Sequence, residues 1–256
     1  MTMNDPHVMA LHYKMKFGEY VDFEKAPPLD YENPDFKVHV EDDNVTVEMK
    51  THFADHDDAK AIVDEFMRTW EVGIGLEIGP GLVSFQHDHT DMVNRNPSPG
   101  APSTYVVGTT RASFSAVIQL SPDKYPSPPE SLRASQEVRW MYERYAMYKA
   151  KRTHLLDLAN YCETVLRDQG GGRKGAAEKY GIALKVLNTM GALADSKGGS
   201  IARKARGIAN PLTREELRWL NQVIPMIIRR AAEVAGNPDG DHQQITMADL
   251  PPLKED

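Results

Sequence analysis

The chain has 256 residues, of which 41% are hydrophobic, so it is long enough to bury a sizeable core in one large domain or two small ones. No stretch approaches about 18 consecutive apolar residues, and the first residues contain no apolar signal segment, so we expect neither a membrane-spanning helix nor a secretory signal. The single cysteine, Cys162, excludes an internal disulfide and favours a reducing compartment, and these features together predict a cytoplasmic protein of bacterial type.

The net charge of −7 is distributed unevenly along the chain. Residues 1–121 contain 9 Lys and Arg against 20 Asp and Glu, whereas residues 144–206 contain 13 Lys and Arg against 5 Asp and Glu. The tail from Ala231 is acidic again. Electrostatics would therefore direct the basic middle segment toward an anionic partner, while the acidic first half opposes nonspecific attraction to nucleic acid.

In the first half, apolar and polar residues alternate in the pattern typical of strands with one buried face. The alternation over residues 9–15 predicts a first strand. The alternation over residues 36–40 and 45–53, on either side of the turn 42–44, predicts a hairpin.

A helix is predicted after this hairpin, with Asp55 or Asp57 as its N-cap and Trp70 near its end. Alternation resumes over residues 71–78, and the Gly-Pro-Gly turn that follows leads into residues 82–91, so we expect a second hairpin there.

A long strand is expected over residues 104–120, with its even-numbered side chains buried, from Val106 to Leu120. The first half is therefore predicted to be a mainly antiparallel sheet with one packed helix.

A proline-rich linker over residues 122–131 is predicted to separate the beta-rich acidic domain, residues 1–121, from a helical domain, residues 132–236, which is followed by a polar tail, residues 237–256. The fold class is thus predicted to be α+β, with an all-helical second half.

The helical half is expected to contain one long helix from Glu130 to Asp168, because apolar positions recur there at steps of three and four. Such a helix would bury its seam against the rest of the helical half or against a second copy of the chain. Thr213 and Glu216 predict a capping box at the start of the last helix, and the polar tail is expected to be mobile for much of its length.

The segment FQHDHTDM contains two histidines and an aspartate at alternate positions, His87, His89 and Asp91. On a regular strand these three side chains share one face, where they could bind a divalent metal ion. His52, Asp55 or His56 could add further ligands. The alternative interpretation is that the histidines are hydrogen-bonded polar residues at the solvated end of a strand.

The string H-D-H-T-D-M also resembles the H-x-H-x-D-H box of metallo-beta-lactamase-like hydrolases, with Met92 in place of the final histidine. The resemblance covers six residues and implies a metal-dependent hydrolase. The downstream histidines, His154 and His242, fall in a helix and in the tail, away from positions that would complete the family's ligand set.

The segment from Ala176 to Asp195 resembles a DNA-binding helix-turn-helix, with small residues in the first helix and Gly181 at the turn. The resemblance implies that the second helix faces the groove with Ala183, Lys185, Asn188 and Thr189. Six basic residues would then bind phosphates: Arg173, Lys174, Lys197, Arg203, Lys204 and Arg206. The alternative is an ordinary helical corner in a bundle.

The sequence favours a non-catalytic binding or assembly protein whose basic helical half contacts a protein or nucleic-acid partner, or a second copy of the chain through the long helix. The first alternative is a helix-turn-helix DNA-binding regulator. The second is a metal-dependent hydrolase that uses the H-x-H-x-D strand. No organic cofactor and no membrane contact are expected.

Overall fold

The computed structural model describes residues 4–18, 26–97, 103–108, 124–197 and 211–253. The chain divides into two compact units, Met1–Pro128 and Pro129–Asp256, and the division falls inside the stretch that the sequence suggests as a linker. None of the helices in these ranges is both long and apolar enough to cross a membrane.

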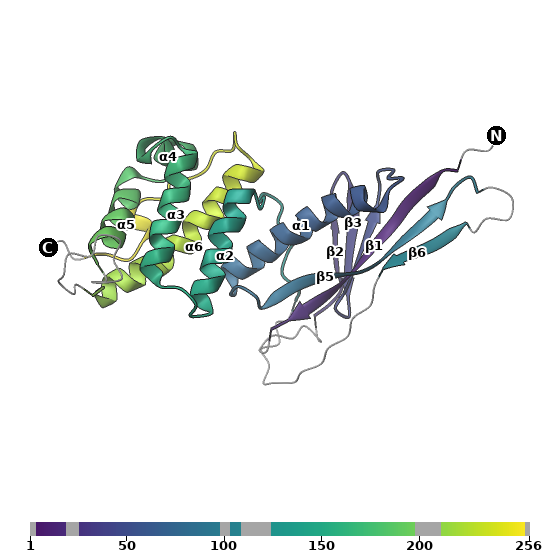
Figure 1. Cartoon of the computed structure of the whole chain (residues 1–256), viewed down its shortest axis with the longest axis horizontal. Helices are drawn as coiled ribbons and strands as arrows, with labels where there is room; N and C mark the ends of the chain where they lie inside the picture. Colours follow the sequence, from purple (N-terminus) through teal and green to yellow (C-terminus); the bar gives the residue numbers. More distant parts are fainter. Residues whose placement is uncertain (1–3, 19–25, 98–102, 109–123, 198–210, 254–256) are drawn as a thin grey trace. The chain divides into compact units, whose positions relative to one another are not determined.

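The first unit is an antiparallel sheet with one helix, α1, packed on one face (Figure 1). The strand order is β2-β3-β4-β1-β5-β6, and every neighbouring pair is antiparallel. The strands are β1 (Pro6–Phe17), β2 (Leu29–Glu32), β3 (Phe36–Glu41), β4 (Asn44–Met49), β5 (Val83–Asn94) and β6 (Thr104–Gly108).

The predicted first hairpin is confirmed as β3 and β4. Asp42 and Asp43 form its two-residue turn with φ of 47° and 62°, the left-handed conformation that matches the twist of the paired strands. The sheet face toward α1 is apolar because Val38, Val40 and Val47 point to it at alternate positions.

The predicted helix is confirmed, but it is longer than expected and replaces the first strand of the second hairpin. α1 runs from His56 to Glu77, and the side chain of Asp55 caps it by accepting from the backbone N–H groups of the first turn. The expectation of a strand over residues 71–78 is wrong because Trp70 and Ile74 continue the buried stripe of the helix at a spacing of four.

The expected long strand after residue 103 is described only as far as β6, and its remaining expected buried positions from Ala112 to Leu120 lie outside the described residues. Within β6 the expected burial of Val106 is wrong, since 62% of this residue is exposed.

The second unit is a bundle of helices around α3, which packs against the other four. The helices are α2 (Gln136–Lys149), α3 (Leu155–Gln169), α4 (Arg173–Tyr180), α5 (Leu184–Ser196) and α6 (Arg214–Gly236). The capping box of Thr213 and Glu216 at the start of α6 is confirmed.

The expected continuous helix from Glu130 to Asp168 is instead two helices, α2 and α3. The chain leaves α2 through Lys151, whose φ is 58°, a left-handed conformation that a continuing helix does not allow. The apolar residues of the predicted seam are found on α2 and α3, and both helices bury them inside the unit. Self-association through one long helix therefore loses its structural basis.

The polar tail is docked over part of its length, against the expectation of mobility. Ile245 forms a parallel bridge with Ile182, and its backbone exchanges hydrogen bonds with Gly181 and Ala183 at 2.9 and 2.8 Å. Leu250 is also buried. These apolar residues, spaced among polar ones, anchor the tail to the helical unit.

Candidate metal centre

A bulge in β5 decides which side chains of the H-D-H-T-D string share a face. His12 on β1 lies opposite His89, and Tyr13 lies opposite His87, so Asp88 is an extra residue without a partner position. A bulge of this kind resets the alternation of side chains. His87 and His89 therefore point to opposite faces of the sheet, and the expectation that both could meet one ion is wrong.

The sheet face opposite α1 brings together His12, His89 and Asp91. One ligand atom from each residue lies within 4.8 Å of the other two. The Nε2 atom of His12 is 3.1 Å from Oδ2 of Asp91, and Nε2 of His89 is 4.0 Å from Oδ1 of the same carboxylate. We call these three residues the His12 cluster.

In both imidazoles of the His12 cluster, the Nδ1 atom has an oxygen partner. Nδ1 of His89 lies 2.9 Å from Oδ2 of Asp88, and Nδ1 of His12 lies 3.3 Å from the hydroxyl of Thr46 on β4. An oxygen partner on one ring nitrogen fixes the tautomer and orientation that present the other nitrogen to a metal. Both Nε2 atoms are thereby left facing the Asp91 carboxylate.

The two nitrogen to oxygen spacings are compatible with a first-row transition metal, whereas the near-parallel rings of His12 and His89, with centroids 4.2 Å apart, must tilt apart for both to bind one ion in their own planes. Ligand bonds of about 2.0–2.1 Å in a tetrahedral site place neighbouring donor atoms roughly 3.4 Å apart, which lies between the two nitrogen to oxygen distances given above. Two imidazoles and one carboxylate are a recurrent ligand set that leaves coordination positions open. Partial exposure of the three side chains, 25% to 36%, gives access from solvent.

His87 lies on the other face, under α1. Its Nε2 atom is 2.9 Å from the hydroxyl of Thr90, and its ring meets Tyr13 edge-on with centroids 5.2 Å apart. Burial lowers the pKa of His87, so the neutral imidazole is favoured. Tyr13 in turn donates to Asp64, which is also paired with Lys60.

The other expected ligands do not join the His12 cluster. The ring of His56 lies 5.5 Å from that of His87, Asp55 caps α1, and His52 stacks on His7 at the start of β1. His12 was missed as a ligand. The alternating pattern puts His12 on the polar face of its strand, but only the pairing of β1 with β5 places it beside His89.

No family model, no curated protein and no solved structure matches the chain.

The helix-turn-helix-like segment is formed by α4 and α5. Gly181 joins them in the left-handed conformation, with φ of 57° and ψ of 44°. Lys185 and Asn188 are exposed and Thr189 is partly exposed, whereas the opposite side of α5, including Val186 and Met190, is buried.

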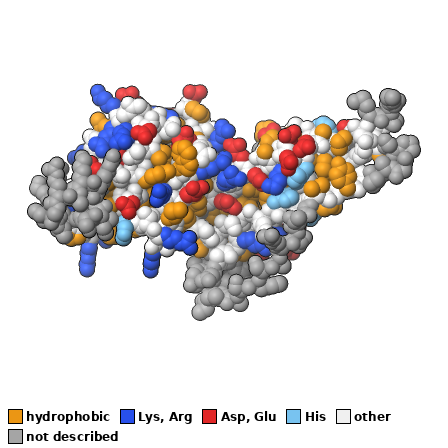
Figure 2. Space-filling model, viewed as in Figure 1, with side chains coloured by type: hydrophobic (Ala, Val, Ile, Leu, Met, Phe, Trp, Pro, Cys, Tyr) orange, Lys and Arg blue, Asp and Glu red, His pale blue; other side chains and the backbone are white. Residues whose placement is uncertain are grey.

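The basic residues expected to bind phosphates are differently placed. Nε of Arg173 is 2.6 Å from the buried carboxylate of Glu163, and Lys197 is 3.0 Å from Glu216, so both serve ion pairs within the unit. Lys174 is exposed. Three positions lie outside the described residues: Arg203, Lys204 and Arg206. Figure 2 shows the Lys and Arg side chains of this unit interspersed with Asp and Glu on the visible face.

Proposed function

We propose that the first unit binds a divalent transition-metal ion through the His12 cluster. The observation that supports this most directly is the convergence of both Nε2 atoms on one carboxylate, while Asp88 and Thr46 hold the two Nδ1 atoms. Nitrogen ligands favour zinc and its neighbours over magnesium and calcium, which prefer oxygen ligands throughout.

Three protein ligands leave room for a water molecule or another ligand on the ion. Zinc lowers the pKa of a bound water to about 7, which supplies hydroxide for hydrolysis, and this keeps metal-dependent hydrolysis as the chemistry that such a site offers. Met92 is buried on the other face of β5, so even a histidine at this position would not complete the hydrolase box here.

Isothermal titration of the untagged chain with zinc tests the proposal. We expect one ion per chain, with affinity reduced at least about tenfold by His12→Gln or His89→Gln. His87→Gln is the matched control, because it removes a histidine from the same strand but from the opposite face. Loss of binding in His87→Gln with unchanged binding in His12→Gln would overturn the assignment.

A second candidate function is nucleic-acid contact by the second unit through α4 and α5. The left-handed turn at Gly181 and the exposed polar edge formed by Lys185 and Asn188 favour it. Binding of a fluorescent DNA duplex should then weaken steeply with salt and be reduced by Lys185→Glu. Arg218→Glu on α6 makes the same change of charge elsewhere in the unit and should have less effect. Absence of binding at low salt would remove this candidate.

A further inference from the structure

The end of α2 and the turn that follows it concentrate positive charge on the second unit. Residues 144–152 contain four Lys and Arg and no Asp or Glu, and the nearest acids in the sequence are Glu143 and Asp157. All four side chains are exposed, and none forms an ion pair with a residue that the structure describes: Arg144, Lys149, Lys151 and Arg152. We call the last three of them the basic turn.

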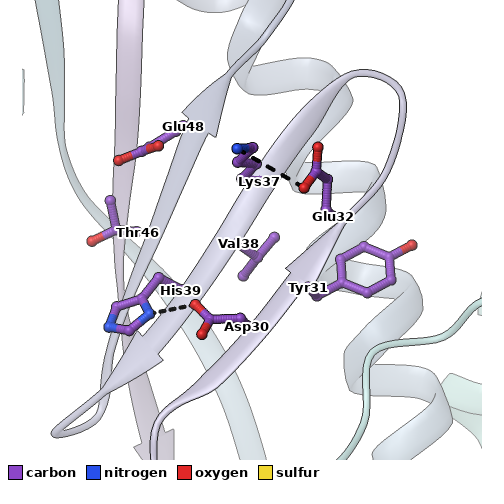
Figure 3. A pocket seen from close by; sticks show the side chains of 8 residues that line it. All are labelled: Asp30, Tyr31, Glu32, Lys37, Val38, His39, Thr46 and Glu48. Atoms are coloured by element: carbon purple, nitrogen blue, oxygen red, sulfur yellow. Dashed lines mark hydrogen bonds and ion pairs between the residues drawn. The ribbon is translucent and has the colours of Figure 1, made fainter.

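Several other charged groups of the chain are compensated within the fold. Three other basic residues of the second unit are paired with carboxylates: Arg173, Lys197 and Arg230. In the groove over β2, β3 and β4 of the first unit, Figure 3 shows His39 against Asp30 and Lys37 against Glu32. The basic turn differs because the described chain supplies no counter-charge for it, so its charge is available to an anionic partner.

The backbone of the basic turn adds a second observation. Lys151 has a φ of 58°, in the left-handed region that glycine or asparagine adopts more easily than lysine does. The N–H groups of Lys151 and Arg152 donate to the carbonyls of Tyr148 and Met147 at 2.9 and 2.8 Å, so the turn is tight. Backbone strain would favour another residue at this position, whereas its charge gives the lysine a reason to be there.

Apolar and planar groups adjoin the basic turn on α2. Trp140 and Met147 are 44% and 45% exposed. They share one side of α2 with Arg144, because residues three and four positions apart are neighbours on a helix surface. The guanidinium of Arg144 lies over the ring of Tyr161 on α3, 5.0 Å from its centroid. An exposed indole and a guanidinium supported by an aromatic ring therefore lie beside uncompensated positive charges.

We infer that the basic turn, together with Trp140 and Arg144, binds single-stranded nucleic acid. The phosphates supply the missing negative charge, and the unpaired bases present flat faces that stack on the indole and the guanidinium. From Trp140 to Lys149 the helix rises about 14 Å, so one strand can contact the indole and the basic turn together. This surface belongs to the second unit, and the inference does not depend on the proposed metal site.

A lipid surface with negative charge suits this part of the unit less well. A helix that lies in a membrane interface turns a broad apolar face toward the lipid. α2 buries its apolar face inside the unit instead, through Val138, Met141 and Tyr145. The two exposed apolar side chains, Trp140 and Met147, suit stacking on individual bases better than insertion.

Fluorescence anisotropy of the full chain with labelled dodecanucleotides tests the inference. The probes are a single strand of mixed sequence, an abasic strand with the same number of phosphates, and a duplex of the mixed sequence. We expect the single strand to bind at least about tenfold more tightly than the abasic strand, because bases stack on aromatic side chains. Its affinity should fall steeply with salt. Trp140→Ala should weaken single-strand binding at least about fivefold and leave duplex binding unchanged, since a duplex keeps its base faces stacked inside.

Lys151→Asn tests the basic turn without endangering the fold. Asparagine tolerates the left-handed conformation better than lysine, so this variant loses one charge and no stability. It should weaken single-strand binding several-fold. Lys174→Asn is the matched control, because it removes the same charge from an exposed position on α4 and should leave the affinity unchanged.

Four outcomes would overturn the inference. The first is absence of single-strand binding at low salt, and the second is equal affinity for the intact and abasic strands. The third is an equal effect of Lys151→Asn and Lys174→Asn, which would place binding elsewhere on the chain. The fourth is sedimentation with anionic lipid vesicles that Lys151→Asn abolishes, without any single-strand binding, which would assign the basic turn to a membrane surface.

Discussion

His12 and His89 lie directly opposite each other on neighbouring strands, and their imidazole rings stack with centroids 4.2 Å apart and planes within 10°. Both rings lie on the same face of the sheet, and because their planes are nearly parallel, one ring must tilt before both Nε2 atoms can bind the same ion. The arrangement depends on the pairing of β1 with β5, because each strand contributes one ring.

Zinc is expected to raise the melting temperature of the wild-type chain. A ligand at about 100 times its dissociation constant stabilises the folded state by about 2.7 kcal/mol, provided that it does not bind the unfolded chain. Asp91→Asn should abolish most of this increase because it removes the carboxylate from the His12 cluster. Asp57→Asn at the exposed start of α1 is the control. An equal rise in both variants would show that zinc binds elsewhere.

Asp88→Asn should reduce zinc affinity without removing a ligand. Asp88 acts through the 2.9 Å contact with Nδ1 of His89, and losing such a supporting carboxylate costs about 10- to 100-fold in metal affinity. The ratio of affinities by titration, with circular dichroism to verify folding, measures this effect. Unchanged affinity would show that Asp88 does not orient the imidazole.

Acidification should destabilise the chain partly through His7. Burial lowers the pKa of His7 below its usual 6.5, and its Nδ1 lies 3.2 Å from Nδ1 of His52. Because the pKa is lower in the folded state, the contribution of His7 is present above pH 6.5 and is lost as pH falls below it. Urea unfolding at pH 8 and pH 5.5 should therefore show a smaller change in His7→Gln than in wild type. Equal changes would contradict the prediction.

Trp70→Ala should destabilise the first unit by about 3–5 kcal/mol. Trp70 is fully buried between α1 and the sheet, and its Nε1 donates to the carbonyl of Pro126 at 3.2 Å. Ile62→Ala, on the exposed side of the same helix, should cost far less. Urea denaturation followed by tryptophan fluorescence and circular dichroism gives the free energy of unfolding of each variant. Similar losses in the two variants would show that Trp70 is not a central residue of the core.

Gly181→Ala should destabilise the second unit by about 1–2 kcal/mol, since the left-handed conformation there is costly for most L-residues. A Cβ atom at this position would also lie 3.1 Å from Nη1 of Arg230. Gly181→Asn should cost less because asparagine tolerates the conformation better. If both variants melt at the wild-type temperature, the turn is not strained.

Local patterns predicted the elements whose formation depends on neighbouring residues in the sequence. The β3–β4 hairpin and the capping box of α6 were readable for this reason. The same patterns gave a wrong prediction where a short segment fits both a strand and a helix. Residues 71–78 alternate like a strand, but the helix before them continues to bury Trp70 and Ile74 on one face.

The candidate site was only partly predictable. His89 and Asp91 were identified from their spacing, whereas His12, about 77 positions away in the chain, joins them only through strand pairing. The exclusion of His87 depends on the bulge at Asp88, which leaves no signature in the alternation of apolar and polar residues. The pairing of β1 with β5 therefore replaces His87 by His12 in the predicted set of three ligands.

The docked C-terminal tail sets the true end of the second folding unit. Composition suggests that the chain could be shortened at Gly236, yet Nη2 of the buried Arg230 donates to the carbonyl of Gln243 at 2.6 Å. Removing the tail would leave this guanidinium without one of its acceptors and would uncover Ile182. A fragment for biophysical work on the helices alone should therefore extend to Leu250, because Ile245 and Leu250 are buried and Ile245 pairs with Ile182 of the helical unit.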